Sequence, residues 1–251
     1  TKLFIKNRKN FVNKLERKSI AFFNSNDIYP ISADSTLPFD QHRDIFYLSG
    51  IDQEESLLVL FPDSKDIEYK EMLFLRETNE YITHWEGEKL TKEQAKNISG
   101  INNIFWLGEF EDILKEVLSQ ADFVYINTNE HYRQNVQTQT REDRFINRLK
   151  NINGLKFKKS NPILQKQRSV KDQIEIELIK NACEITKKGF ERVLTFIKPG
   201  VWEYEIEAEF SHEFLRNRSR RFAYTPIIAS GRNSNFLHYV YNNKQCLDGE
   251  I

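Results

Sequence analysis

The sequence predicts an α/β protein, with a mixed-sheet α/β domain over residues 1–155 and the beginning of an α+β domain over residues 156–251. Up to about residue 150, short apolar runs alternate with helical segments, which is typical of a sheet covered by helices. After that point, two long amphipathic patterns follow one another and lead into two strand-like runs. The chain has 251 residues, which is enough for two domains of modest size.

The expected strands of the first domain are apolar runs bounded by Gly, Pro, Asn or Asp. They are Ser19–Ser25, Asp44–Gly50, Ser56–Pro62, Glu71–Glu77, Asn103–Glu109 and Asp122–Thr128. Amphipathic spacing predicts helices over residues 1–15, over Thr91–Ile98 with Thr91 as N-cap, over Glu109–Gln120 and over Thr140–Ile152. No glycine-rich phosphate loop follows any of these runs, so nucleotide binding is not indicated.

A linker is expected at residues 153–167, which are polar, contain Gly and Pro, and break the helical period. Beyond it, apolar residues recur at helical spacing over Ile174–Ile197 and predict one long helix. Ser169 and Asp172 resemble a capping pair, and Pro199-Gly200 ends the pattern.

A second helix is expected from Trp202 to about Leu215, and a hairpin of two strands over residues 222–231 and 235–242. This helix carries five glutamates that could suggest a metal site, namely Glu203, Glu205, Glu207, Glu209 and Glu213. Residues two apart scatter around a helix and do not converge. We therefore interpret these carboxylates as a solvated face.

Composition argues against several classes of protein. The 37 basic residues balance the 37 acidic ones, so no net charge attracts nucleic acid or an anionic membrane. The basic cluster Arg216, Arg218, Arg220 and Arg221 is interpreted as a solvated helix end and not as a phosphate-binding patch. No apolar run approaches the roughly 20 residues that span a bilayer, and the two cysteines lack disulfide or zinc spacing. We expect a cytoplasmic protein.

The second half of the chain carries an ordered set of motifs. A long helix ends at Pro-Gly, a Glu-rich helix follows, and FAYTPIIASGRNSNFLHYVYNNKQCLDGEI then combines Tyr-x-x-Ile-x-x-Ser-Gly, Leu-His-Tyr and an Asp-Gly turn. This set resembles the opening of the pita-bread metallopeptidase domain, above all that of aminopeptidase P, the Xaa-Pro aminopeptidases. The segments ISADSTLPFDQHRDIFYLSGI and HWEGEKLT resemble the creatinase-type N-terminal domain of the same family. The resemblance therefore covers nearly the whole chain.

The resemblance implies hydrolysis of the bond between an N-terminal residue and a following proline, at a site with two divalent metal ions, typically manganese. In the family order, the five metal ligands (two Asp, one His and two Glu) follow residue 251. We therefore expect no metal ligand within this chain and interpret it as an inactive fragment. The resemblance also implies a peptide substrate and a homo-oligomer, either dimer or tetramer.

Four residues match family positions near the substrate. His238 matches a histidine that hydrogen-bonds substrate or intermediate without ligating metal, a role that suits an imidazole donor near neutral pH. Tyr224 matches a tyrosine behind the metal carboxylates. Asp34 and Trp85 match residues near the substrate, the Trp being supplied by a neighbouring subunit. The remaining histidines, His42, His84, His131 and His212, have no ligand spacing and are interpreted as surface or core residues.

Three alternatives remain open. His238 could instead be a strand histidine bonded to a backbone carbonyl, Tyr224 a packed strand tyrosine, and Trp85 an ordinary loop anchor. A prolidase-type dipeptidase shares the YxPIIASGxNxxxLHY pattern and would prefer dipeptides to longer peptides. A non-catalytic pita-bread protein that has lost the metal ligands would be a binding module.

Overall fold

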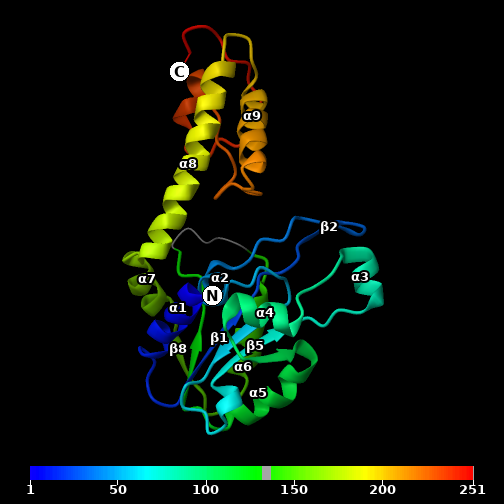
Figure 1. Cartoon of the computed structure of the whole chain (residues 1–251), viewed down its shortest axis with the longest axis vertical. Helices are drawn as coiled ribbons and strands as arrows, with labels where there is room; N and C mark the ends of the chain where they lie inside the picture. The colour runs from blue at the N-terminus through cyan, green and yellow to red at the C-terminus, as the bar shows by residue number, and fades with distance from the viewer. Residues whose placement is uncertain (132–136, 251) are drawn as a thin grey trace. The chain divides into compact units, whose positions relative to one another are not determined.

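The structure is a computed structural model that describes residues 1–131 and 137–250. It divides into two compact units, unit 1 (Thr1–Val170) and unit 2 (Lys171–Ile251) (Figure 1). Unit 1 contains a mixed α/β sheet, and unit 2 begins with two long helices, as the sequence predicted.

Unit 1 is built on a six-stranded sheet with the order β6-β5-β4-β1-β7-β8. The strands are β1 (Ser19–Asn24), β4 (Leu57–Leu60), β5 (Glu71–Leu75), β6 (Asn103–Trp106), β7 (Phe123–Ile126) and β8 (Lys156–Lys159). The first five confirm expected strands. Strand β4 runs antiparallel to β1 and β5, whereas β5–β6, β1–β7 and β7–β8 are parallel pairs. In register, Ala21 of β1 lies opposite Leu60 of β4 and Tyr125 of β7.

The sheet has an apolar core on each face, because side chains alternate along its strands. Ile20 and Phe22 of β1 belong to one cluster, which α5 (Phe110–Leu118) and α6 (Arg141–Lys150) complete. Ala21 and Phe23 belong to the other cluster. The helices that complete this second cluster are α1 (Lys2–Val12), α2 (Arg43–Ser49), α4 (Lys92–Ser99) and α7 (Asn161–Ser169).

The prediction of a strand over Asp44–Gly50 is wrong, because these residues form α2 (Arg43–Ser49). Ile45 and Leu48 are fully buried at the i, i+3 spacing of a helix, while Phe46 between them is 42% exposed. The helix ends at Gly50, whose φ of +73° suits glycine. A Cβ there would also lie 2.2 Å from the Phe4 ring.

The segment expected to be a linker, residues 153–167, instead contains β8 and the start of α7, and unit 1 extends to Val170. β8 is a lysine-rich edge strand. Lysines on an edge strand discourage edge-to-edge association, and they also interrupt the apolar pattern by which a strand is predicted. The ammonium groups of Lys156 and Lys158 lie 5.7 and 4.4 Å from the ring centroid of Phe123 on β7.

Unit 2 is dominated by α8 (Gln173–Phe196) and α9 (Glu203–Arg216), which pack side by side (Figure 1). Asp172 caps α8 in a capping box with Glu175, so of the expected capping pair the structure uses Asp172. The rings of Phe190 and Phe210 meet edge to face at 5.0 Å between centroids. This close approach requires Gly189, because a Cβ there would lie 2.8 Å from Phe210.

The expected hairpin over residues 222–231 and 235–242 is wrong, since neither run forms a strand within the described part of unit 2. A short 3₁₀ turn, η3 (Gly231–Asn235), lies between them. The N–H of Ile228 donates to the Asn242 side chain at 2.9 Å, and the N–H of Ser230 donates to the Glu203 carboxylate at 2.7 Å. Among the described residues, neither N–H donates to a neighbouring strand. These segments are held by side-chain anchors.

Five further short elements belong to the described part of unit 1. The strands β2 (Pro30–Ser32) and β3 (Ser35–Thr36) form a small separate sheet. The helix α3 (Glu80–Glu86) follows β5. Two 3₁₀ turns, η1 (Ile67–Tyr69) and η2 (Leu107–Glu109), flank β5 and β6. Among the described residues, no helix is both long and apolar enough to cross a membrane.

Candidate functional site

The side chain of Glu203 organises unit 2 around the segment that carries His238. Glu203 is fully buried in the first turn of α9, where the helix dipole favours a carboxylate. Its Oε1 accepts hydrogen bonds from the backbone N–H and the hydroxyl of Ser230, at 2.7 and 2.8 Å. Its Oε2 accepts from the Tyr239 hydroxyl at 2.6 Å and from the Lys244 N–H at 2.9 Å. One carboxylate thus joins α9 to two distant segments.

These contacts set the ionisation of Glu203. Burial alone would raise the pKa of Glu203, but the hydrogen bonds from Tyr239, Lys244 and Ser230 outweigh it and hold the pKa below its ordinary value. The pKa of the Tyr239 phenol is raised, because the phenol is buried and lies beside the Glu203 carboxylate. Glu203 is therefore a charged acceptor, and Tyr239 a neutral donor.

Other acidic residues of α9 also have specific partners. Glu207 accepts from the Asn242 amide at 2.7 Å, and Arg192 of α8 pairs with Glu209 and Glu213. The interpretation of these glutamates as a solvated face is therefore wrong for Glu203, which is fully buried. Sequence patterns assigned no role to Asn242.

The structure places His238 directly before the buried anchor Tyr239. His238 is exposed and makes no side-chain hydrogen bond within the described residues, whereas Tyr239 is 8% exposed. Val240 and Tyr241 are exposed as well, so the strict strand alternation expected here is not observed. Tyr239 fixes the backbone beside His238 and leaves the imidazole free to meet a ligand.

Tyr224 lies at an apolar hollow of about 510 Å³ in unit 2. Phenylalanine side chains form much of its wall, namely Phe190, Phe210, Phe214 and Phe222. Tyr224 is 74% exposed, and no hydrogen bond joins its hydroxyl to another described residue. The structure thus brings neither a carboxylate nor His238 into hydrogen-bond contact with Tyr224.

The two candidate residues of unit 1 lie on its short outer elements. Asp34 is exposed in the turn between β2 and β3. Trp85 lies on α3 and is 70% exposed, and its ring contacts those of Tyr81 and His84 at centroid distances of 6.3 and 5.4 Å. No hydrogen bond links Asp34 to Trp85 in the described ranges. Both side chains are accessible.

Helix α3 has no buried residue, so apolar packing does not hold it. An ion-pair clamp of Arg76, Glu86, Lys89 and Glu54 takes that role. Arg76 at the end of β5 donates to both carboxylate oxygens of Glu86 at 3.0 and 3.1 Å. The ammonium of Lys89 lies 3.1 Å from Glu86 and 2.5 Å from Glu54.

The clamp also affects the ionisation of Glu86 and the position of Trp85. The hydrogen bond from Arg76 lowers the pKa of Glu86, against the opposing effect of burial. Because Glu86 follows Trp85 in the chain, the clamp fixes the helix end that carries the exposed indole.

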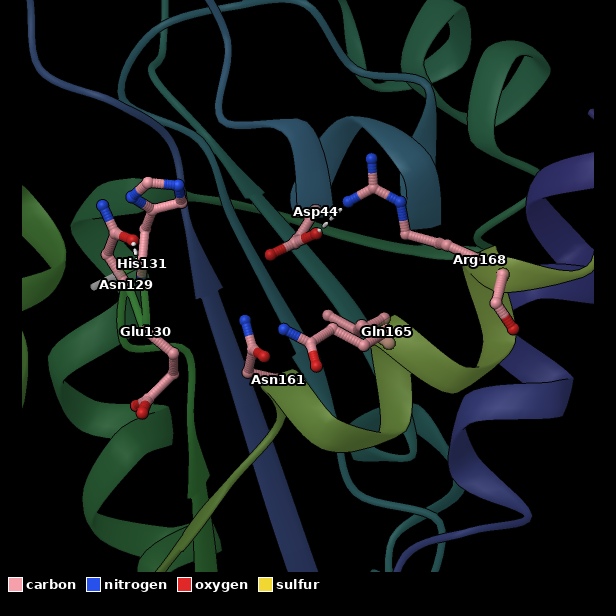
Figure 2. A pocket seen from close by; sticks show the side chains of 9 residues that line it. Asp44, Asn129, Glu130, His131, Asn161, Gln165 and Arg168 are labelled. Carbon is pink, nitrogen blue, oxygen red and sulfur yellow. Dashed lines mark hydrogen bonds and ion pairs between the residues drawn. The ribbon is translucent and has the colours of Figure 1, made fainter. Parts of the chain in front are cut away.

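A polar hollow of about 660 Å³ lies elsewhere in unit 1 (Figure 2). Figure 2 shows Arg168 of α7 reaching Asp44 of α2, with Nη1 to Oδ1 at 2.7 Å, while Asn129 and His131 face them from the segment after β7. Asp44 also accepts from Asn127 at 3.1 Å. None of the four predicted site residues lines this hollow.

Comparison with known proteins agrees with this architecture in both units. Residues 4–125 match the family model described as aminopeptidase P, N-terminal domain, and residues 177–251 match metallopeptidase family M24. The chain belongs to the aminopeptidase P family.

Members of the aminopeptidase P family with curated names match most of the chain. It is 28% identical over 250 residues to Xaa-Pro aminopeptidase of Escherichia coli, covering 99% of this chain and 56% of that protein. It is 27% identical over 229 residues to human Xaa-Pro aminopeptidase 3, covering 90% and 45%. The chain thus spans about half the length of the curated relatives it matches.

Solved aminopeptidase P structures share the fold. A putative aminopeptidase P from Bacillus anthracis superposes with a TM-score of 0.89 at 28% identity, covering 99% of this chain and 59% of the other. Aminopeptidase P from E. coli with the inhibitor Pro-Leu gives 0.85 at 27% identity, covering 99% and 57%. These similarities confirm the predicted mixed α/β architecture and the opening of a pita-bread domain.

Residues 1–131 and 137–250 contain no group of three or more His, Cys, Asp or Glu side chains that could hold a metal ion. The carboxylates of α9 are engaged by protein donors, as described above. The residues present therefore do not fit a metal centre, and we assign none of them as a ligand.

Proposed function

We propose that this member of the aminopeptidase P family is a metal-dependent aminopeptidase that releases the N-terminal residue from peptides with proline at the second position. The observation that supports it most is the match of both family models, together with 28% identity over 250 residues to an Xaa-Pro aminopeptidase. Solved neighbours include an E. coli aminopeptidase P variant in complex with substrate. The metallopeptidase match supports the use of divalent metal, for which we propose two manganese ions.

Such ions would supply an activated water and polarise a carbonyl, and we assign none of the described residues as their ligand. The residues of this chain have binding and positioning roles in the proposal. His238 donates a hydrogen bond to the substrate or to the developing oxyanion, and its exposed imidazole beside the fixed Tyr239 suits that role. Tyr224, which lines the apolar hollow of unit 2, belongs in this proposal to the hydrogen-bond network behind the metal-binding carboxylates.

Trp85 and Asp34 contribute to substrate binding in this proposal. A flat, exposed indole provides an apolar wall for a proline ring or a side chain. We propose that it reaches the site of a neighbouring subunit in a homo-oligomer, where the clamp of Arg76 and Glu86 holds it in place.

A substrate panel tests the proposal. The protein encoded by the whole gene is incubated with manganese and an Xaa-Pro-Xaa tripeptide, an Xaa-Pro dipeptide or an Xaa-Ala-Xaa control. We expect release of the first residue from the tripeptide, with little cleavage of the alanine control and none after chelation. Cleavage restricted to the dipeptide would indicate a prolidase. No cleavage of any peptide would favour a binding module.

A further inference from the structure

The carboxyl ends of the parallel strands β1 and β7 meet the start of α6 at a buried carboxylate, Glu142. Its side chain is 9% exposed. Oε2 accepts from the backbone N–H of Asn24 at 3.1 Å and from its side-chain amide at 2.9 Å. Oε1 is buried and has no hydrogen-bond partner. One oxygen of this carboxylate is thus satisfied and the other is not.

A second buried acceptor in the same place lacks a partner. Asn127, which follows β7, is 3% exposed and donates its amide to Asp44 at 3.1 Å. Its Oδ1 is buried without a hydrogen bond. Both Asn127 and Glu142 line a partly enclosed cavity of about 130 Å³, together with Ser25, His42 and Arg141. Two acceptors cannot satisfy one another while Glu142 is ionised, and buried polar atoms in native proteins nearly always have partners.

The surrounding charges do not neutralise Glu142. It forms no ion pair within the described residues, and burial raises its pKa to about 7 despite the hydrogen bonds from Asn24 and the nearby backbone N–H of Asn127. Burial lowers the pKa of the Arg141 guanidinium, whose charge interacts more strongly with Glu55 and Asp27 than with Glu142.

The remaining titratable groups at the cavity are also accounted for. Asp143 is engaged with Thr140 in the capping box of α6. Burial lowers the pKa of His42, which favours its neutral form, and its Nδ1 accepts from the N–H of Asp44. Among the described residues the cavity therefore has two unused acceptors, one of which belongs to a carboxylate without an ion-pair partner.

We propose that this cavity binds a small organic cation, a primary ammonium or guanidinium group, whose N–H donors bond to Glu142 Oε1 and Asn127 Oδ1. Unused acceptors select a donor, and a buried carboxylate is stabilised by a positive charge. The volume corresponds to about four water molecules at roughly 30 Å³ each, which is more room than a single metal ion fills. The carboxyl end of parallel strands is also where α/β folds commonly bind ligands. None of the residues proposed for peptide hydrolysis lines the cavity.

Thermal unfolding of the 251-residue chain at pH 8.5 tests the proposal. The probes are methylammonium and guanidinium chloride at low millimolar concentration, and tetramethylammonium chloride serves as a cation without N–H donors. We expect the first two to raise Tm in a saturable manner and the third to have no effect. At pH 5.5, where Glu142 is protonated, the increase should disappear.

Glu142→Gln is the matched variant, because its amide can donate to Asn127 and thereby remove both unused acceptors. It should fold, and the cation concentration that gives half of the Tm increase should rise at least tenfold. The exposed control Glu77→Gln should keep the response of the parent protein. Asn127→Ala should weaken the response in the same assay. An equal response to tetramethylammonium, a full response in Glu142→Gln, or no saturable response at pH 8.5 would overturn the proposal.

Discussion

Replacing Glu203 by Ala should unfold or strongly loosen unit 2, because one carboxylate serves four donors from two segments. Each hydrogen bond to a charged group contributes about 1.5–3 kcal/mol, although such contributions are not additive. Some of the donors freed by the substitution can reach water. We therefore expect a loss of about 3–5 kcal/mol, because each buried donor left without an acceptor costs about 1–3 kcal/mol.

Equilibrium denaturation followed by tryptophan fluorescence measures this loss. Trp202 immediately precedes Glu203 and is the tryptophan of unit 2, so Trp85→Phe and Trp106→Phe in the background make the signal specific. Glu191→Gln, which changes an exposed carboxylate of α8 paired with Lys187, is the control and should cost less than about 0.5 kcal/mol.

The pH dependence follows from the lowered pKa of Glu203. Its stabilising contribution is present above the pKa of a glutamate in the unfolded chain and is lost as the pH falls through the lower pKa of the folded state. Unit 2 of the Glu203→Ala variant should therefore lose less stability on acidification than unit 2 of the parent. A cost below about 1 kcal/mol, or an unchanged acid dependence, would refute the reasoning that Glu203 anchors the His238 segment.

Three further changes test the other site residues. Arg76→Ala should release α3 and speed proteolysis between residues 77 and 90. The cost in stability should be about 1 kcal/mol, because Glu86 is partly exposed. Arg43→Ala, which removes the exposed ion pair of Arg43 with Asp40, is the control and should not speed this proteolysis. Trp85→Ala in the active protein should raise KM with little change in kcat, and an unchanged KM would remove its binding role. His238→Ala should lower kcat by about 10²–10³ with metal retained, and His238→Asn should recover part of it; full activity in His238→Ala would leave the residue a packing role.

The sequence predicted those helices and strands that are determined by the pattern of their own residues. β1 is a continuous apolar run because it is buried on both faces, and Thr91 is the N-cap of α4, as predicted, and forms a capping box with Gln94. α2 was misread because the run DIFYLSG is rich in aromatic and branched residues, although Ile45 and Leu48 already show helical spacing.

The remaining features depend on residues far apart in the chain. Glu203 is buried because Ser230, Tyr239 and Lys244 approach it from 27 to 41 positions away, and no local pattern contains that information. The unused acceptors of Asn127 and Glu142 meet only after β7 and α6 pack against β1. Tyr239, within the Leu-His-Tyr motif, and Ser230, within the Ser-Gly motif, were the only local signals of the anchor.

Release of free N-terminal residue from an Xaa-Pro-Xaa peptide, followed by mass spectrometry, tests the proposed activity most directly. The protein encoded by the whole gene, supplied with manganese, should yield the first residue and a peptide that begins with proline. Chelation should stop the reaction, and residues 1–251 alone should not support it. An intact peptide with the metal-loaded protein, or cleavage at another bond, would contradict the account.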